Sequence, residues 1–225
     1  MFVELSIIFP IVGYAQSGLK AGFTMLTPQF VNISGDNMPL ETLAPTGEDV
    51  DTDGGIVVET LSAGGEAVDM YMWINWGGDD IGWMNGDFEL VKNVTFAPGT
   101  GLWVQGTSTD AAIQSAGKVS VDDVVVQLKA GFTATGNCMP VEVALQDIVP
   151  EGDDVDTDGG IVIETLSAGG EAVDMYMWIN WGGDDIGWMN GDFEIVNGVK
   201  FAPGAGLWVQ GTKDTEYLRI PAPEL

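Results

Sequence analysis

The chain has 225 residues, with 34 acidic residues against seven Lys and Arg and no His, so its formal net charge at pH 7 is −27. Nucleic acids and anionic membrane surfaces repel so acidic a protein, which excludes them as favoured partners. Hydrophobic residues make up 45% of the chain, which is enough for packed cores, so we expect a folded protein.

Residues 1–15 are apolar, but their pattern is that of a strand. They lack the basic start of a signal peptide and carry Glu4 and Pro10. They are also too few for a membrane span of about 20 residues. Apolar side chains recur at every second position, namely Val3, Leu5, Ile7, Phe9 and Ile11. This period of two predicts a strand, and we assign residues 1–18 to an extended N-terminal assembly segment.

A long repeat divides the rest of the chain. Residues 50–107 return as residues 155–212 with six differences in 58 positions, and LKAGFT opens each copy. A repeat of about 100 residues has the size of a small domain, whereas solenoid units have roughly 20–50 residues. We therefore predict two domains, residues 19–117 and 118–225. The six differences are Val58/Ile163, Leu90/Ile195, Lys92/Asn197, Asn93/Gly198, Thr95/Lys200 and Thr100/Ala205.

The repeat has the local pattern of β-structure throughout. With 32 Gly, ten Pro and no sustained helical period, we expect few helices. Gly-rich turns such as SAGGE and APGTG predict hairpins between the strands that flank them. The predicted fold is all-β, with two tandem, near-identical β-sandwich or barrel-like domains and an extended N-terminal strand. The predicted strands are residues 56–61, 67–75, 94–96, 102–105, 111–114 and 217–220.

A strand-like lead-in precedes each LKAGFT. Residues 118–127 (KVSVDDVVVQ) occupy the place in copy 2 that residues 9–18 occupy in copy 1. The second lead-in follows a complete domain, whereas the first has no domain before it in the chain. We therefore expect residues 118–127 to bridge the two domains, and residues 2–12 to form the same contact with the next subunit.

An acidic D-x-D-x-D-G loop occurs once in each copy. Alternate carboxylates on a tight turn can converge on one hard cation, and Ca²⁺ takes six to eight oxygen ligands. The loop resembles the first half of an EF-hand calcium loop, but Thr60 and Thr165 stand where the EF-hand has its last Glu. A solvated acidic turn is the alternative interpretation. The predicted Ca²⁺ ligands are Asp49, Asp51, Asp53, Asp154, Asp156 and Asp158.

Four tryptophans recur in both copies and leave two interpretations open. They can fill the core and its rim, or they can stack on sugar rings. Asn32 and Asn93 begin N-x-Ser/Thr sequons, which predict glycosylation. Cys138 has Asn37 as its counterpart, so we expect a buried small hydrophobic residue. The tryptophans are Trp73, Trp76, Trp83 and Trp103, and Trp178, Trp181, Trp188 and Trp208.

Two resemblances point to an extracellular structural role. Residues 3–11 resemble the donor strand of chaperone–usher pilins. The order LKAGFT, IVVETL, YMWI, GW and FAPGxGLWV resembles modules of secreted bacterial surface proteins, which implies no activity. No catalytic signature is found, and without His the Ser-His-Asp triad is absent, so we do not expect an enzyme.

We therefore predict the structural subunit of an extracellular or cell-surface filament. Its partner is a further copy of itself, joined head to tail by donation of the N-terminal strand to a sheet edge. The alternative is a bivalent, secreted, lectin-like module that binds glycans through two identical sites.

Overall fold

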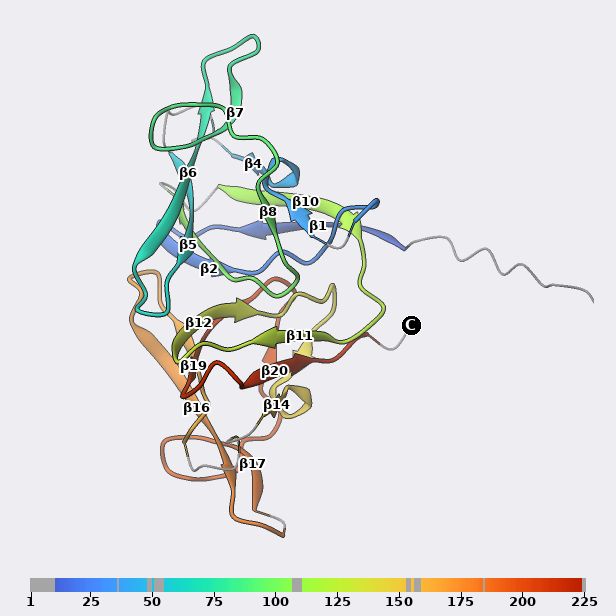
Figure 1. Ribbon diagram of the computed structural model, residues 1–225, viewed down its shortest axis with the longest axis vertical. Helices are drawn as coiled ribbons and strands as arrows, with labels where there is room; N and C mark the ends of the chain where they lie inside the picture. Colours follow the sequence, from blue (N-terminus) through green and yellow to red (C-terminus); the bar gives the residue numbers. More distant parts are fainter. Residues whose placement is uncertain are drawn as a thin grey trace, which may run out of the picture.

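The computed structural model describes residues 11–35, 37–47, 50, 55–106, 111–152, 155, 159–183 and 185–223. These residues form strands β1 to β20 and two short 3-10 turns, η1 and η2 (Figure 1). Neighbouring strands within each sheet run antiparallel, which confirms the predicted all-β fold. A search of the described part of the chain finds no helix with the length and hydropathy of a membrane span.

Copy 1 consists of three sheets. Its three-stranded sheet has the order β1 (Val12–Gly18), β10 (Ala112–Lys118), β4 (Ala44–Thr46). Its five-stranded sheet has the order β2 (Gly22–Leu26), β9 (Leu102–Gly106), β5 (Ile56–Leu61), β6 (Ala67–Asn75), β7 (Ile81–Met84). The third sheet pairs β3 (Met38–Pro39) with β8 (Thr95–Phe96), and η1 (Leu40–Thr42) follows β3.

Copy 2 repeats this topology strand for strand. Its three-stranded sheet has the order β11 (Val124–Gln127), β20 (Tyr217–Ile220), β14 (Val149–Glu151). Its five-stranded sheet has the order β12 (Gly131–Gly136), β19 (Gly206–Gly211), β15 (Val162–Leu166), β16 (Ala172–Asn180), β17 (Ile186–Met189). The third sheet pairs β13 (Val143–Ala144) with β18 (Lys200–Phe201), and η2 (Leu145–Asp147) follows β13.

Each copy has its own apolar core, to which both its larger sheets contribute, as in a sandwich. In copy 1, Val58 and Val104 from the five-stranded sheet and Ile113 from the three-stranded sheet belong to one buried cluster. Buried Trp83 joins this cluster and donates its Nε1–H to the Leu43 carbonyl at 2.8 Å. Trp188 makes the same bond in copy 2. These two tryptophans therefore belong to the cores, as buried Trp usually does once its N–H has a partner.

The strand predictions are largely correct, but one predicted hairpin is wrong. Predicted strands 56–61, 67–75 and 217–220 coincide with β5, β6 and β20. The strands flanking APGTG do not pair with each other, because β8 pairs with β3 and β9 pairs with β2 and β5. The APGTG turn therefore leads the chain from one sheet to another instead of closing a hairpin.

The lead-ins pair differently from the expectation. β1 pairs with β10 along its whole length, and β11 pairs with β20, so the first and last strands of each copy are neighbours. The first lead-in thus has a partner in its own chain. The segment 118–127 does not bridge the domains by a shared strand, since it begins at the end of β10 and continues into β11.

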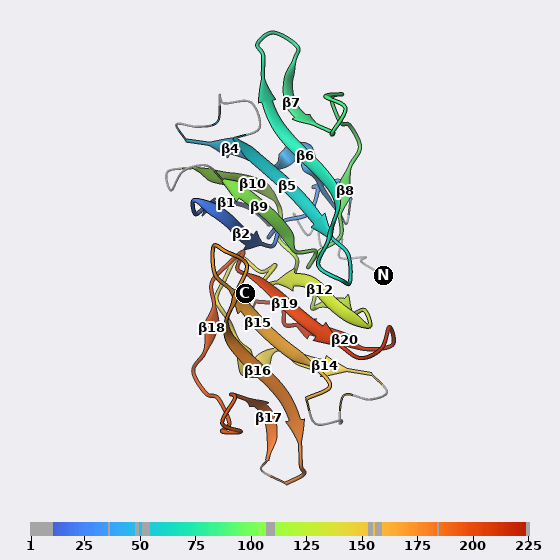
Figure 2. The same cartoon turned by 90° about the vertical axis from the view of Figure 1, so that its left-hand side faces the viewer.

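The two copies face each other through the same surface. The Phe23 amide donates to the Ala168 carbonyl at 3.0 Å, and the equivalent Phe132 amide donates to the Ala63 carbonyl at 2.8 Å. The turn between β5 and β6, residues 62–66, thereby reaches copy 2, and its counterpart 167–171 reaches copy 1 (Figures 1 and 2). Contacts that recur with the copies exchanged define an isologous interface with an approximate twofold axis.

Candidate functional site

Two long hairpins lie at opposite ends of the molecule (Figures 1 and 2), and more than half of the exposed large apolar residues in the described part of the chain belong to them. We call them the outer hairpins: β6–β7 with the loop to residue 91, and β16–β17 with the loop to residue 196. Isolated apolar side chains on a surface are ordinary, but a group of them indicates a contact surface. The exposed large apolar residues of the outer hairpins are Val68, Met70, Trp76, Ile81, Phe88 and Leu90, and Val173, Met175, Trp181, Ile186, Phe193 and Ile195.

The ring of Phe88 is held on the outer hairpin by a tight turn. Asn85 Oδ1 accepts hydrogen bonds from the amides of Asp87 and Glu89, both at 3.0 Å, and the Phe88 amide donates to the Asn85 carbonyl. Phe88 has a φ of 60°, in the left-handed region that bulky side chains rarely adopt. The turn thus fixes a strained residue whose side chain faces solvent.

Phe88 stacks on Trp76, which begins the turn at the tip of the hairpin. The ring centroids are 6.1 Å apart with an interplanar angle of 25°. Phe88 is 54% exposed and Trp76 53% exposed, so each residue is about half accessible to solvent. We call the two stacked rings the aromatic platform.

Copy 2 carries the same platform. Trp181 and Phe193 have centroids 6.1 Å apart, and Phe193 has a φ of 59°. Asn190 Oδ1 accepts from the amides of Asp192 and Glu194, as Asn85 does in copy 1. The molecule thus presents two equivalent platforms at opposite ends.

Acidic residues lie on the same turns as the rings of the copy 1 platform. The Trp76 amide donates to the Asp80 carbonyl at 3.1 Å, which places Asp79 and Asp80 on the same turn as the indole. Asp87 and Glu89 flank Phe88 in the sequence and are exposed. An aromatic face beside carboxylate acceptors suits a neutral ligand with an apolar face and hydroxyl donors.

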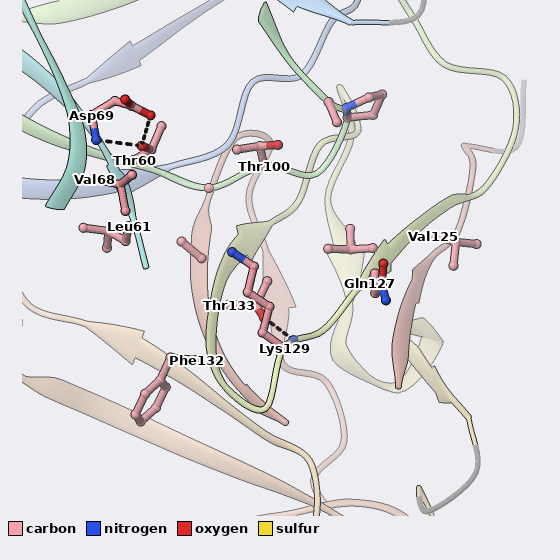
Figure 3. A pocket seen from close by; sticks show the side chains of 15 residues that line it. Thr60, Leu61, Val68, Asp69, Thr100, Val125, Gln127, Lys129, Phe132 and Thr133 are labelled. Carbon is pink, nitrogen blue, oxygen red and sulfur yellow. Dashed lines mark hydrogen bonds between the residues drawn. The ribbon is translucent and has the colours of Figure 1, made fainter. Parts of the chain in front are cut away.

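A groove of about 470 Å³ lies between the copies, beside β11 (Figure 3). Thr60 from copy 1 donates to Asp69 Oδ2 at 3.1 Å, and the Lys129 amide from copy 2 donates to Thr133 Oγ1 at 2.9 Å. Each of these bonds joins two groups of the same copy. The exposed side chains of Val125 and Gln127 line the same groove along an outer strand of the β11–β20–β14 sheet.

Most of the predicted assembly and metal residues lie outside the described residues. This applies to Val3, Leu5, Ile7 and Phe9, and to Asp49, Asp51, Asp53, Asp154, Asp156 and Asp158. Ile11 is 46% exposed, and its carbonyl accepts the Val119 amide at 2.8 Å. Within the described ranges no three His, Cys, Asp or Glu side chains are grouped so as to hold a metal ion. Ca²⁺ binding by the acidic loops stays a prediction.

Both predicted glycosylation sites belong to surface turns. Asn32 Oδ1 accepts from the amide and the hydroxyl of Ser34, each at 3.0 Å. Asn93 is exposed with a φ of 66°, and Thr95 of its sequon accepts a long bond of 3.5 Å from Asn37. Glycosylation of either residue stays a prediction.

Cys138 is buried in the core of copy 2, as the sequence predicts. It is 3% exposed, and burial raises the pKa of its thiol to about 12. The thiol is therefore protonated at physiological pH and belongs to the core.

Phe88 and Phe193 were not predicted as site residues from the sequence. Trp76 and Trp181 were recognised as possible sugar-stacking residues, but their partner rings follow 12 positions later in the chain. The available signal was the Asn-Gly-Asp sequence at residues 85–87 and 190–192, which favours a tight turn. Comparison with models of protein families, with curated proteins and with solved structures finds no match to this chain.

Proposed function

We propose that this protein is a bivalent, lectin-like binding protein that holds glycans on the aromatic platforms at its two ends. One observation carries the proposal: each copy holds a half-exposed Phe at positive φ against a half-exposed Trp. Positive φ for a bulky residue costs of order 1–3 kcal/mol, and such strain concentrates at functional sites. Core packing does not account for rings that face solvent.

The surrounding charge favours a neutral, hydroxylated ligand. Residues 66–92 contain six acidic residues and one Lys, so two outer hairpins that met each other would repel. Anionic ligands are disfavoured for the same reason. A sugar ring can stack its C–H face on the indole while its hydroxyls donate to the carboxylates. The charged residues are Glu66, Asp69, Asp79, Asp80, Asp87, Glu89 and Lys92.

The duplication compensates for the weak binding expected of a single platform. A shallow platform binds a single sugar weakly, because little of the ligand is buried. Two platforms on one chain convert the second contact into an intramolecular one and can raise the overall affinity by about 10²–10⁴-fold. A polymer or a cell surface with repeated glycans would therefore be retained where a free sugar would not.

Glycan-array binding and affinity electrophoresis in soluble polysaccharides test this proposal. We expect the double variant Trp76→Ala/Trp181→Ala to lose binding, and either single variant to lose at least tenfold in avidity while keeping single-site binding. Val68→Ala/Val173→Ala is the matched control, because these residues are exposed on the same hairpins but do not belong to the platforms. Equal binding by the two double variants would rule out the platforms as the glycan site.

A filament subunit is the second candidate. It is favoured by the position of β1, an outer strand whose Val12 and Tyr14 are exposed and which continues from the alternating residues 3–11. Donation of residues 3–11 to β11 of another subunit, beside the groove in Figure 3, would join extracellular subunits head to tail. The interface between the copies is isologous, so a filament needs a second, heterologous contact.

Negative-stain microscopy separates the two candidates. The filament proposal expects long particles from the full chain and single molecules after deletion of residues 1–10. Short particles from the full chain at high concentration would exclude it and leave glycan binding unaffected.

A further inference from the structure

A cavity of about 360 Å³ lies where the two copies meet. Its walls come in equivalent pairs from both copies, including Glu59 with Glu164 and Trp103 with Trp208. Glu59 lies opposite Trp103 in the register of β5 and β9, and Glu164 lies opposite Trp208 in β15 and β19. Cross-strand partners share one face of a sheet, so each carboxylate lies beside an indole.

The crossed turns and two phenylalanines fix the indoles of this cavity. Trp103 stacks on Phe23 and Trp208 stacks on Phe132, each pair with ring centroids 5.0 Å apart. Gly170 lies against Trp103, and Gly65 lies against Trp208. A Cβ added to Gly170 would come within 3.0 Å of the Trp103 ring, and one added to Gly65 would come within 3.1 Å of the Trp208 ring. Figure 2 shows the turn of each copy reaching across to the other. The cavity is therefore a product of the interface, and neither copy forms it alone.

No basic side chain of the described residues neutralises the two carboxylates. Ion pairs in the described part of the chain join Lys200 with Glu142, and Arg219 with Asp123 and Glu151, and none of these includes Glu59 or Glu164. Glu59 and Glu164 are half-buried among the apolar and aromatic walls of the cavity. Their negative charges therefore lie next to two electron-rich aromatic rings, a combination that attracts organic cations.

We propose that this cavity binds a linear aliphatic diammonium ion, with one ammonium group beside each glutamate. The charge at both ends matches the two symmetry-related carboxylates, and the methylene chain contacts the indoles between them. A metal ion lacks the apolar part that the indoles would contact, and a monoamine satisfies only one carboxylate. The net charge of −27 raises the local concentration of any cation. This site is separate from the aromatic platforms and does not depend on the function proposed for them.

Isothermal titration of the full chain with 1,5-diaminopentane tests the proposal. We expect one ion per chain, bound at least tenfold more tightly than n-pentylamine and more tightly than Ca²⁺ at the same ionic strength. Glu59→Gln and Glu164→Gln should each weaken diamine binding by a similar factor of at least tenfold, because the site is symmetric. The double variant should bind diamine no better than pentylamine.

The matched control is Glu66→Gln/Glu171→Gln. It removes the same amount of charge from the turns that follow β5 and β15, but these exposed glutamates do not line the cavity. We expect it to bind diamine within twofold of the unmodified chain. Equal losses in both double variants, or equal binding of diamine and pentylamine, would show general charge attraction and overturn the proposal. Melting curves check that all variants fold.

Discussion

Asn85 and Asn190 determine where the exposed aromatic rings lie. Each side-chain oxygen accepts two backbone amides of the following turn, and this leaves the next Phe in the left-handed region. Asn suits this position because its short side chain can hydrogen-bond to backbone groups two residues ahead. The sequence allows the turn to be predicted at this scale. It does not give the stacking of Phe88 on Trp76, which depends on how two separate turns meet.

Cys138 gives a prediction on pH dependence. Burial raises the pKa of its thiol from 9.0 to about 12, so the neutral thiol stabilises the fold fully below pH 9. This contribution is lost as the pH rises from 9 towards 12, at about 1.4 kcal/mol per pH unit. We expect the free energy of unfolding to fall more steeply above pH 9 in the unmodified chain than in Cys138→Ala, as measured by urea denaturation.

Two tyrosines also have raised pKa values, so the pH dependence is compared between the unmodified chain and the Cys138→Ala variant. Burial is the main cause that raises the pKa of Tyr71 and of Tyr176. The negative charges of Asp69 and Asp174, respectively, raise these pKa values further. Both tyrosines are present in both proteins, so their effect cancels in the comparison. Parallel pH profiles for the unmodified chain and Cys138→Ala would contradict the prediction.

At the scale of elements, local sequence patterns predict where the strands are. They do not predict which distant strands pair with each other. β5 and β6 were predicted correctly because two strand-like runs and the Gly-rich turn that joins them lie within one short segment. The pairing of β1 with β10 joins residues about 100 positions apart, and no local pattern encodes it. The APGTG turn was misread because Pro and Gly indicate a turn without indicating which sheet the next strand joins.

The bend that leads into β8 explains one difference between the copies and yields a second prediction. Asn93 has a φ of 66°, and Gly198 has a φ of 82° at the equivalent position, so both residues meet the same left-handed requirement. We expect Asn93→Ala to lower the free energy of unfolding by about 1 kcal/mol, because Ala disfavours this conformation. Asn93→Gly should be neutral or stabilising.

Urea denaturation of protein made without glycosylation measures both changes. The two variants remove the same sequon, so they differ only in backbone preference. Equal stability of the Ala and Gly variants would show that the turn relaxes and would contradict the assigned conformation.

For the whole molecule, charge opposes the association of the two copies. A net charge of −27 makes the compact state repel itself, and salt screens this repulsion. We expect the melting temperature at pH 7 to rise between 10 and 100 mM NaCl, where the Debye length falls from about 30 to about 10 Å. A gain of about 1 kcal/mol corresponds to a rise of about 2–4 °C for a chain of this size.

The same salt series near pH 4 is the control. The sequence has an isoelectric point of about 4.1, so little self-repulsion remains there. Calorimetry should show that the salt effect disappears. An equal rise at both pH values would assign the effect to general salting-out.

The repeat in the sequence predicts two domains but does not show how they face each other. The residues that form the interface, Gly65 and Trp103 with their counterparts, were interpreted only as a turn glycine and as core or sugar-binding tryptophans. Their contacts come from the other copy, so periodicity within one copy carries no information about them.

The link between β10 and β11, residues 119–123, has a consequence for behaviour on dilution. Two separate copies with this interface would form a homodimer that dissociates as its concentration falls. A short link instead holds the copies at an effective concentration on the order of millimolar, whatever the concentration of the protein. On dilution, the molecule would therefore keep both ends, and the cavity between its copies, as a single unit.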